Sequence, residues 1–447
     1  MHKYISHTTE EINQMLTDIG FNSIEELFQD IPEEVKIDGL NLPDGLSEIE
    51  VLSIMKRLAS KNKSIEEQTC FLGAGAYDHY IPTVIDSLIS RQEFYTAYTP
   101  YQPEVSQGTL RAIFEFQTMI CELTGLDVAN ASMYDAPTAV AEAMNMTCGA
   151  ARRGQVLIAG NTHPETKKIV DTYAGATDKT VTELKCVDGK IDVEDLRSKM
   201  SKEIGCVIIQ TPNFFGLIEN IQEVADIVHE FKGYLVVSAD PLSLGLLEAP
   251  GNLGADVVVG EAQVLGNSLS FGGPYVGYFS TTKKLMRKIP GRVVGETKDA
   301  DGNRGYVLTL QSREQHIRRE KATSNICSNQ ALCALISSIY VSVMGKVGIK
   351  EVATQTAQKS YYAREKLLET NKFTPVFNSP FFREFVLKFE GDIDALNAYL
   401  EANNVLGGYN IGKDFKDLKG YYLVAVTEKR TKEEIDNLAL LISQFEV

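Results

Sequence analysis

A tyrosine-rich segment at residues 94–108 carries the side chains best suited to chemistry. It has the sequence FYTAYTPYQPEVSQG, in which Tyr95, Tyr98 and Tyr101 recur at intervals of three and Gln102 follows the last of them. Its prolines fix φ and remove N–H donors, so they oppose a regular helix and hold the phenol and amide groups in set positions. Tyrosine is also common at protein interfaces. The segment therefore predicts either a substrate-contacting site or a subunit interface.

A central stretch of the chain has no amine side chain. No Lys, Arg or His occurs between residues 233 and 282. The lysines that follow, Lys283, Lys284 and Lys288, are typical of a solvated helix start. A nucleophilic lysine instead needs a desolvated site that lowers its pKa. The stretch is therefore expected to offer no amine for an imine bond.

Two turns of small residues resemble phosphate sites only superficially. Gly73 and Gly75 look like the start of a dinucleotide fingerprint, but the third glycine and a preceding strand are missing. The loop at residues 131–139 contains no glycine and leads into a helix. Its Pro137 removes one N–H group that would point at an anion. We expect a structural loop at the first turn and a weak anion cup at the second.

The elements that position these side chains alternate between short apolar runs and helical patterns. The apolar runs are 156–159, 181–184, 206–210, 234–238, 257–259 and 275–279. This alternation is typical of βαβ units and a largely parallel sheet. The helical pattern at residues 221–231 has one apolar stripe, with His229 on its wet face. We therefore predict an α/β fold.

The two ends of the chain differ from this centre. Residues 1–65 are predicted to form a helical arm with capping boxes at Thr8 and Ser23, which either embraces a neighbouring subunit or packs as an ordinary helix pair. Residues 66–327 form the predicted large domain, and residues 328–447 form connecting helices and a smaller α+β domain. In the smaller domain the expected strands are 385–389 and 421–427, and the expected helices are 392–403 and 432–445.

The composition is that of an ordinary globular protein and excludes several partners. The chain has 44 Lys and Arg against 60 Asp and Glu, so its net charge is −16. This charge repels phosphate backbones, which argues against nucleic acid as a partner. The uncharged stretch at residues 322–345 is interrupted by polar side chains, so it favours a buried helix over a membrane span.

The cysteines and the first residues bear on metal sites and location. The seven cysteines form no C-x-x-C pair and have no histidine at metal-ligand spacing, so reduced thiols and no metal site are expected. The first residues, MHKYISHTTEEINQML, contain early acids and no apolar core of a signal peptide. A cytoplasmic protein is expected.

Several motifs together resemble a known enzyme superfamily. A TPNFFG turn after a strand, a later strand ending in SAD, and then GAD and FGGP resemble the large domain of fold-type I pyridoxal-phosphate enzymes. YTPYQPEVSQG, QTPNFFG, GADVVVGEAQ, SFGGPYVGYF and KATSNICSNQAL look like the P-protein family of the glycine cleavage system, in the α subunit of its two-subunit form. The resemblance spans essentially the whole chain.

This resemblance implies a division of labour between two subunits. The family's β subunit has a His-Lys pair where this chain has Glu261-Ala262-Gln263-Val264, so pyridoxal 5'-phosphate is expected covalently on the partner β subunit and not on this chain. Glycine would lose CO2 there, and its aminomethyl group would pass to the lipoyl group of the H-protein. Asp240 stands where the family's partner of the pyridine nitrogen would be, and either caps a turn or contacts a cofactor.

The resemblance also implies site residues. The residues expected to complete the partner's pocket are Tyr95, Tyr98, Tyr101 and Gln102. Thr323, Ser324 and Asn325, at an expected helix start after a basic run, would bind near the partner's phosphate. The alternative is an ordinary helix cap made by Ser324 or Asn325.

Two other functions stay open on the sequence. An autonomous pyridoxal-phosphate enzyme would need an unusual lysine, with Lys283, Lys284 and Lys321 as candidates, and the missing lysine argues against it. A structural or regulatory scaffold subunit would have no use for so many presented tyrosines, which argues mildly against that reading.

Overall fold

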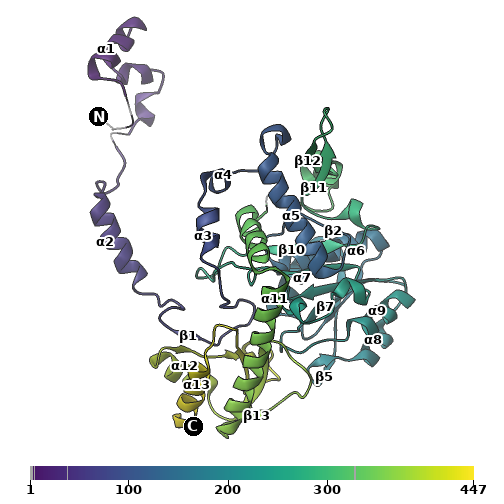
Figure 1. Ribbon diagram of the computed structural model, residues 1–447. Coiled ribbons are helices and arrows are strands. Elements are labelled where there is room, and N and C mark those ends of the chain that lie inside the picture. The colour runs from purple at the N-terminus through teal and green to yellow at the C-terminus, as the bar shows by residue number, and fades with distance from the viewer. Residues whose placement is uncertain (1–3, 5, 38, 327–328, 447) are drawn as a thin grey trace. The chain divides into compact units, whose positions relative to one another are not determined.

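The chain folds into two compact units. The computed structural model describes residues 4, 6–37, 39–326 and 329–446 (Figure 1). The units are Met1–Lys63 and Ser64–Val447. The domain boundary expected at residues 327 and 328 lies outside the described residues.

The first unit contains two capped helices. α1 (Thr9–Asp18) starts at Thr8 and α2 (Glu48–Ala59) starts at Ser47, and each start is a capping box completed by a glutamate in the first turn. The capping box expected at Thr8 is thus confirmed. Between these helices lie the 3-10 turns Glu25–Phe28 and Glu33–Val35.

The capping box expected at Ser23 is wrong. The Glu26 N–H does reach the Ser23 hydroxyl at 3.4 Å, but the Glu26 carboxylate accepts the N–H of Asn22 at 2.9 Å instead of that of Ser23. The structure has only the short 3-10 turn Glu25–Phe28 there, and its N-cap residue, Ile24, makes no side-chain hydrogen bond.

The second unit is built on a seven-stranded sheet. In spatial order its strands are β2 (Val128–Ala129), β10 (Gly277–Thr281), β9 (Val257–Glu261), β8 (Tyr234–Ala239), β7 (Ile204–Thr211), β3 (Gln155–Ala159) and β4 (Thr180–Leu184). The strands from β9 to β4 are parallel, and β10 pairs antiparallel with β9 and β2. The predicted α/β fold with a mostly parallel sheet is confirmed.

Helices cover both faces of this sheet, so its central strands are buried almost continuously. The helices are α5 (Gln107–Thr124), α6 (Ala136–Ala151), α7 (Pro164–Ala176), α8 (Val193–Lys199) and α9 (Ile221–Glu230). Alternate strand residues serve the two faces: Val236 belongs to the core shared with α6 and α7, and Leu235 to the core shared with α5 and α9. The apolar stripe predicted for residues 221–231 is the buried face of α9.

A smaller antiparallel sheet follows near the C-terminus. Its strands in order are β13 (Phe373–Pro375), β14 (Glu384–Phe389), β17 (Tyr421–Ala425) and β16 (Tyr409–Asn410). It shares an aromatic-rich core with α12 (Ile393–Ala402) and α13 (Lys432–Gln444). β14, β17, α12 and α13 match the strands and helices expected from the sequence, whereas β13 and β16 were not predicted. The remaining pairs are β1 (Thr69–Cys70) with β15 (Val405–Leu406), β5 (Cys186–Val187) with β6 (Lys190–Ile191), and β11 (Val293–Lys298) with β12 (Arg304–Thr309).

One long helix connects the two sheets. Among the described residues, α11 (Ala331–Glu369) is the one helix long and apolar enough to cross a membrane by length and composition. Gly345 interrupts it with φ +57° and ψ −175°, which leaves an apolar first segment only about 21 Å long at 1.5 Å per residue. Cys333, Ala334 and Tyr340 of this segment are buried in the core of the large sheet. These contacts favour a core helix.

Replacing Gly345 by alanine should lower the free energy of unfolding by about 1–3 kcal/mol, because that backbone region is accessible almost only to glycine. No heavy atom lies within 4 Å of the position a Cβ would take, so the whole effect is conformational. Gly149, in α6, also has open space but no positive φ, and Gly149→Ala should be neutral or stabilising. Urea unfolding of both variants measures the difference, and equal stabilities would contradict the prediction.

Candidate functional site

A cavity of about 390 Å³ lies at the carboxyl ends of β7, β8 and β9. This edge of a parallel sheet is where α/β proteins bind ligands. Gln210, Asp240 and Glu261 reach it from the large sheet. Arg383 and Glu384 reach it from the start of β14 in the smaller sheet. The two sheets therefore enclose one cleft.

Asp240, directly after β8, is fully engaged by its own chain. Its Oδ1 accepts the N–H groups of Leu242 at 2.8 Å and Ser243 at 3.3 Å, which confirms that it caps a turn. Its Oδ2 forms an ion pair with the guanidinium of Arg383. The carboxylate therefore has a cation partner within the chain.

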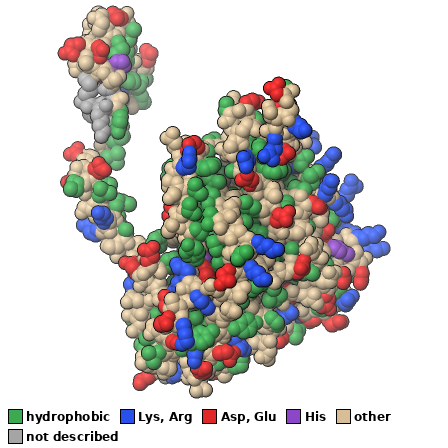
Figure 2. Space-filling model, in the orientation of Figure 1, with side chains coloured by type: hydrophobic (Ala, Val, Ile, Leu, Met, Phe, Trp, Pro, Cys, Tyr) green, Lys and Arg blue, Asp and Glu red, His purple; other side chains and the backbone are tan. Residues whose placement is uncertain are grey.

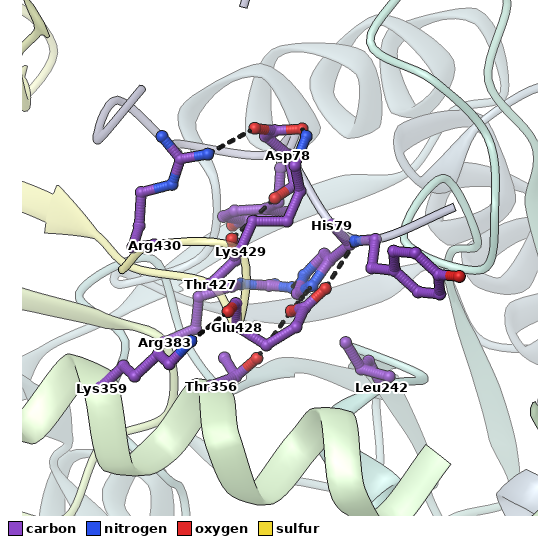
Figure 3. A network of polar contacts seen from close by, with 12 residues as sticks. Asp78, His79, Leu242, Thr356, Lys359, Arg383, Thr427, Glu428, Lys429 and Arg430 are labelled. Atoms are coloured by element: carbon purple, nitrogen blue, oxygen red, sulfur yellow. Dashed lines mark hydrogen bonds and ion pairs between the residues drawn. The ribbon is translucent and has the colours of Figure 1, made fainter. Parts of the chain in front are cut away.

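Arg383 fills the middle of the cleft. Its guanidinium carbon lies 3.3 Å from the centroid of the Tyr77 ring. Its Nη1 donates to Nε2 of His79 at 2.9 Å, and Figure 3 shows these two residues. Burial lowers the pKa of Arg383, but the charge of Asp240 outweighs it and the pKa is raised, so the cation persists. The backbone of Arg383 has φ +63°, a strained region for a residue with a side chain. Surrounding contacts hold this residue in an unfavourable conformation that directs its side chain at Asp240.

His79 and Glu428 form further polar contacts that hold the Arg383 side chain in place. Because a guanidinium can only donate, Nε2 of His79 accepts, and its Nδ1–H donates to Glu428 at 2.6 Å. Glu428 also accepts the N–H of Tyr80 at 2.5 Å and the hydroxyl of Thr356 at 3.1 Å. Burial opposes ionisation of Glu428, but its contacts with His79 and Tyr80 lower its pKa to about 2. A continuous chain of polar contacts thus runs from Asp240 through Arg383 and His79 to Glu428.

Asp78 connects the loop at residues 73–80 to the segment that follows β17. Its two carboxylate oxygens pair with Lys429 at 2.6 Å and with Arg430 at 2.9 Å, and Thr427 donates to its carbonyl at 2.7 Å (Figure 3). Asp78 and Arg430 are both buried. The loop at residues 73–80, expected to be structural, therefore belongs to this network.

The N-terminus of α6 has its donors occupied by carboxylates. Asp135 accepts the N–H of Thr138 at 2.8 Å, and Glu261 accepts the N–H groups of Ala136 at 3.1 Å and Val276 at 3.0 Å. A helix N-terminus of this kind could otherwise hold a phosphate. Because carboxyl groups of the chain already occupy these donors, they are not available to a phosphate.

Glu261 makes stability depend on pH. Burial raises its pKa from 4.5 to about 8, against the N–H bonds that lower it. A folded-state pKa above the unfolded value means that the folded chain binds the extra proton, so this group destabilises the fold progressively as pH rises from about 4.5 to about 8. The Tm of Glu261→Gln should therefore fall less than the Tm of the wild type as the pH rises from 5.5 to 8.5. Parallel Tm curves for the two proteins would refute the assignment.

The predicted tyrosine segment lies apart from this cleft. Tyr95 ends the short helix α4 (Gln92–Tyr95), and the segment continues without regular structure until the 3-10 turn Pro103–Val105. Tyr95, Tyr98 and Tyr101 are 69%, 79% and 61% exposed, and Gln102 is also exposed. Figure 2 shows hydrophobic side chains gathered on the face around α3 (Val84–Ile89) and α4. The tyrosines are thus presented outward, and none of them lines the cleft.

The helix start expected at residues 323–325 is wrong. α10 (Gln315–Arg318) and the 3-10 turn Arg319–Lys321 precede this segment, and α11 begins later. Thr323 and Asn325 are exposed, and the Ser324 hydroxyl accepts the N–H of Ile326 at 3.2 Å and bonds to Glu142. These hydroxyls therefore do not cap a helix, and these residues do not line the cleft.

The topology and the cleft at the strand ends define the chain as a fold-type I pyridoxal-phosphate enzyme in architecture. One solved structure of similar fold is a sphingosine-1-phosphate lyase from Burkholderia pseudomallei, with a TM-score of 0.67 and 12% identity over 92% of this chain and 93% of that one. Another is a cysteine desulfurase from Thermococcus onnurineus, with a TM-score of 0.63 and 14% identity over 85% of this chain and 94% of that one. The chain belongs to the glycine cleavage system P-protein family, whose sequence profile matches residues 2–442.

Closer relatives agree with this assignment. The chain is 52% identical, over 98% of both chains, to proteins of Bacillus mycoides and Bacillus cereus named "Probable glycine dehydrogenase (decarboxylating) subunit 1". It is also similar to a crystal structure of glycine decarboxylase (P-protein) of the glycine cleavage system in inhibitor-bound form. That similarity has a TM-score of 0.91 and 39% identity, over 99% of this chain and 100% of that one.

The residues of the cleft do not fit pyridoxal phosphate. None of the described residues that line it is a lysine, and the candidate amines Lys283, Lys284 and Lys321 are absent from the lining. Asp240, which would face a pyridine nitrogen, is paired with Arg383. The donors that would hold a phosphate are occupied by acidic side chains. An autonomous cofactor-binding enzyme is therefore not favoured.

Proposed function

We propose that this chain is the lysine-free α subunit of a two-subunit glycine decarboxylase. Its partner β subunit carries pyridoxal 5'-phosphate on a lysine, and together they decarboxylate glycine and transfer the aminomethyl group to the lipoyl group of the H-protein. The observation that supports this most strongly is the Arg383–Asp240 pair inside the cleft of a P-protein family member. A chain whose Asp240 is paired with its own Arg383, and whose described cleft residues include no lysine, fits a role through a partner subunit.

Exposed polar side chains are the part of this chain offered to the partner. We assign Tyr95, Tyr98, Tyr101 and Gln102 to completing the partner's pocket. Thr323, Ser324 and Asn325 are assigned to the neighbourhood of its phosphate. Exposure of the three tyrosines supports the first assignment, because phenols at 61–79% exposure are available to a second protein. A cytoplasmic location without a membrane or nucleic-acid partner completes the proposal.

Exchange of the carboxyl carbon of glycine with CO2 tests this function. The purified chain alone should show no exchange, the β subunit alone should show little, and the mixture should be active. Exchange by this chain alone with added pyridoxal phosphate would contradict the proposal. An active β subunit that gains nothing from this chain would indicate a scaffold instead.

The double change Tyr98→Phe and Tyr101→Phe should lower exchange in the assembled enzyme at least about 10-fold, since losing a hydrogen bond to a charged group is equivalent to about 1.5–3 kcal/mol. Tyr399→Phe is the matched control, because that ring packs against Phe445 in the C-terminal core. Initial exchange rates at saturating β subunit measure the effect. Unchanged rates in the double variant would remove the tyrosines from the pocket.

A further inference from the structure

A second cavity, of about 180 Å³, lies behind the tyrosine segment. Its walls are mainly apolar and come from α4, α5 and the start of α11. The larger apolar wall residues are Phe94, Ile113, Phe116, Leu332 and Leu335. Tyr95 and Tyr98 also line it and are exposed, so the cavity opens toward the surface that the segment forms.

Arg292 is the one charged side chain among the described residues that line this cavity. It is 8% exposed, and its Nη1 has no hydrogen-bond partner. Nη2 lies 3.4 Å from the Tyr101 hydroxyl, and the guanidinium carbon lies 5.5 Å from the centroid of that ring. The Arg292 carbonyl accepts the N–H of Ala131 at 2.8 Å, which fixes its backbone beside the large sheet. The guanidinium is thus held in place with one edge free.

A buried cation without a counterion is strongly unfavourable, because desolvation of the charge is not repaid. The chain has 60 acidic residues, yet no Asp or Glu is among the described residues that line this cavity. The other buried arginines of the unit differ in this respect: Arg383 pairs with Asp240, and Arg430 pairs with Asp78. The described residues that line this cavity therefore supply no counterion to Arg292.

We propose that Arg292 binds a carboxylate that enters this cavity from the surface of the tyrosine segment. A guanidinium presents paired N–H donors that match the two oxygens of a carboxylate. The cavity is small and its walls are mainly apolar, so it suits a carboxylate carried on a small group. This inference rests on the proposed function, which places the segment against the partner's active site. Two sources supply the same chemistry: the carboxylate of glycine, or an Asp or Glu side chain of the partner.

The test compares wild type, Arg292→Met, Arg292→Lys and Arg304→Met in the assembled enzyme. Arg304 is an exposed arginine of β12, so its variant loses the same charge without the cavity. Each variant is measured for partner affinity by titration calorimetry and for the glycine KM in the exchange reaction. Circular dichroism and Tm verify that each variant is folded. Arg292→Lys keeps the charge, so it should show a smaller effect than Arg292→Met even where both are less stable.

A glycine KM raised at least 10-fold in Arg292→Met, with partner affinity unchanged, would support the proposal with glycine as the carboxylate. A partner Kd raised at least 10-fold, with KM unchanged at saturating partner, would support it with a partner side chain. If Arg292→Met changes neither the glycine KM nor the partner Kd, or if Arg304→Met changes them as much, the proposal is overturned.

Failure of the proposed function would be visible separately, as absence of glycine exchange in the wild-type mixture. In that case the arginine is tested on the full chain alone with acetate as the probe. Acetate should raise the Tm of the wild type and of Arg304→Met above that in equal chloride, and should not do so for Arg292→Met. Equal shifts in all three, or no shift in the wild type, would overturn the proposal.

Discussion

Replacing Arg383 by methionine should lower the free energy of unfolding by about 3–5 kcal/mol, the range expected when one partner of a buried ion pair is removed. The change leaves the Asp240 carboxylate in the cleft with its cation gone and breaks the contacts to Tyr77 and His79. Methionine keeps much of the volume, so the loss reports charge rather than a cavity. Urea unfolding monitored by circular dichroism measures it.

The double variant Arg383→Met with Asp240→Asn separates the ion pair from simple misfolding. Asparagine keeps an oxygen to accept the N–H groups of Leu242 and Ser243 while removing the unpaired charge. It should therefore regain a substantial part of the lost stability. Arg304→Met should lie within about 0.5 kcal/mol of the wild type, as expected for an exposed pair. A single variant Arg383→Met within 1 kcal/mol of the wild type would show that the pair does not hold the cleft.

Gly216→Ala should have a comparable effect, about 3–5 kcal/mol, for a steric reason. Gly216 has φ +82°, and a Cβ there would lie 1.9 Å from the Glu384 carbonyl oxygen and 2.5 Å from its carbon. Both a left-handed backbone and overpacking against rigid backbone contribute. Because Phe382 donates its N–H to the Gly216 carbonyl at 3.0 Å, the displaced strand start would carry Arg383 away from Asp240.

Gly108→Ala provides the control for this steric argument. Gly108 lies in α5, no heavy atom is within 4 Å of its Cβ position, and its φ is not positive, so alanine should be neutral or stabilising there. Denaturant unfolding of the pair gives the difference directly. Gly216→Ala with near wild-type stability would mean that the turn and the start of β14 can separate without loss.

Local sequence patterns predicted the helices and strands whose apolar residues recur with a clear period. The apolar stripe of α9 and the continuous apolar runs of β7 and β8 are buried as expected, because burial on one face or on both leaves a direct trace in the sequence. The turn cap by Asp240 was also predictable, since its partners Leu242 and Ser243 are close along the chain.

Distant partners and uncapped helix ends were not predictable in this way. Arg383 is 143 residues from Asp240, and Arg292 is 191 residues from Tyr101, so no local pattern connects either pair. A single arginine beside the apolar residues of PFFREFVLKF was the only local signal for Arg383. The start of α11 was misplaced because Gln330 makes no side-chain cap, whereas the hydroxyls at residues 323 and 324 imitate one.

We propose that this chain serves a cofactor that its partner subunit holds and that it does not hold itself. The most direct test adds pyridoxal phosphate to the chain alone, to the β subunit alone and to their mixture, reduces each with borohydride and maps the labelled peptide. We expect label in the mixture, on a lysine of the β subunit, and none on this chain under any condition. Label on Lys283, Lys284, Lys321 or any other lysine of this chain would contradict the account.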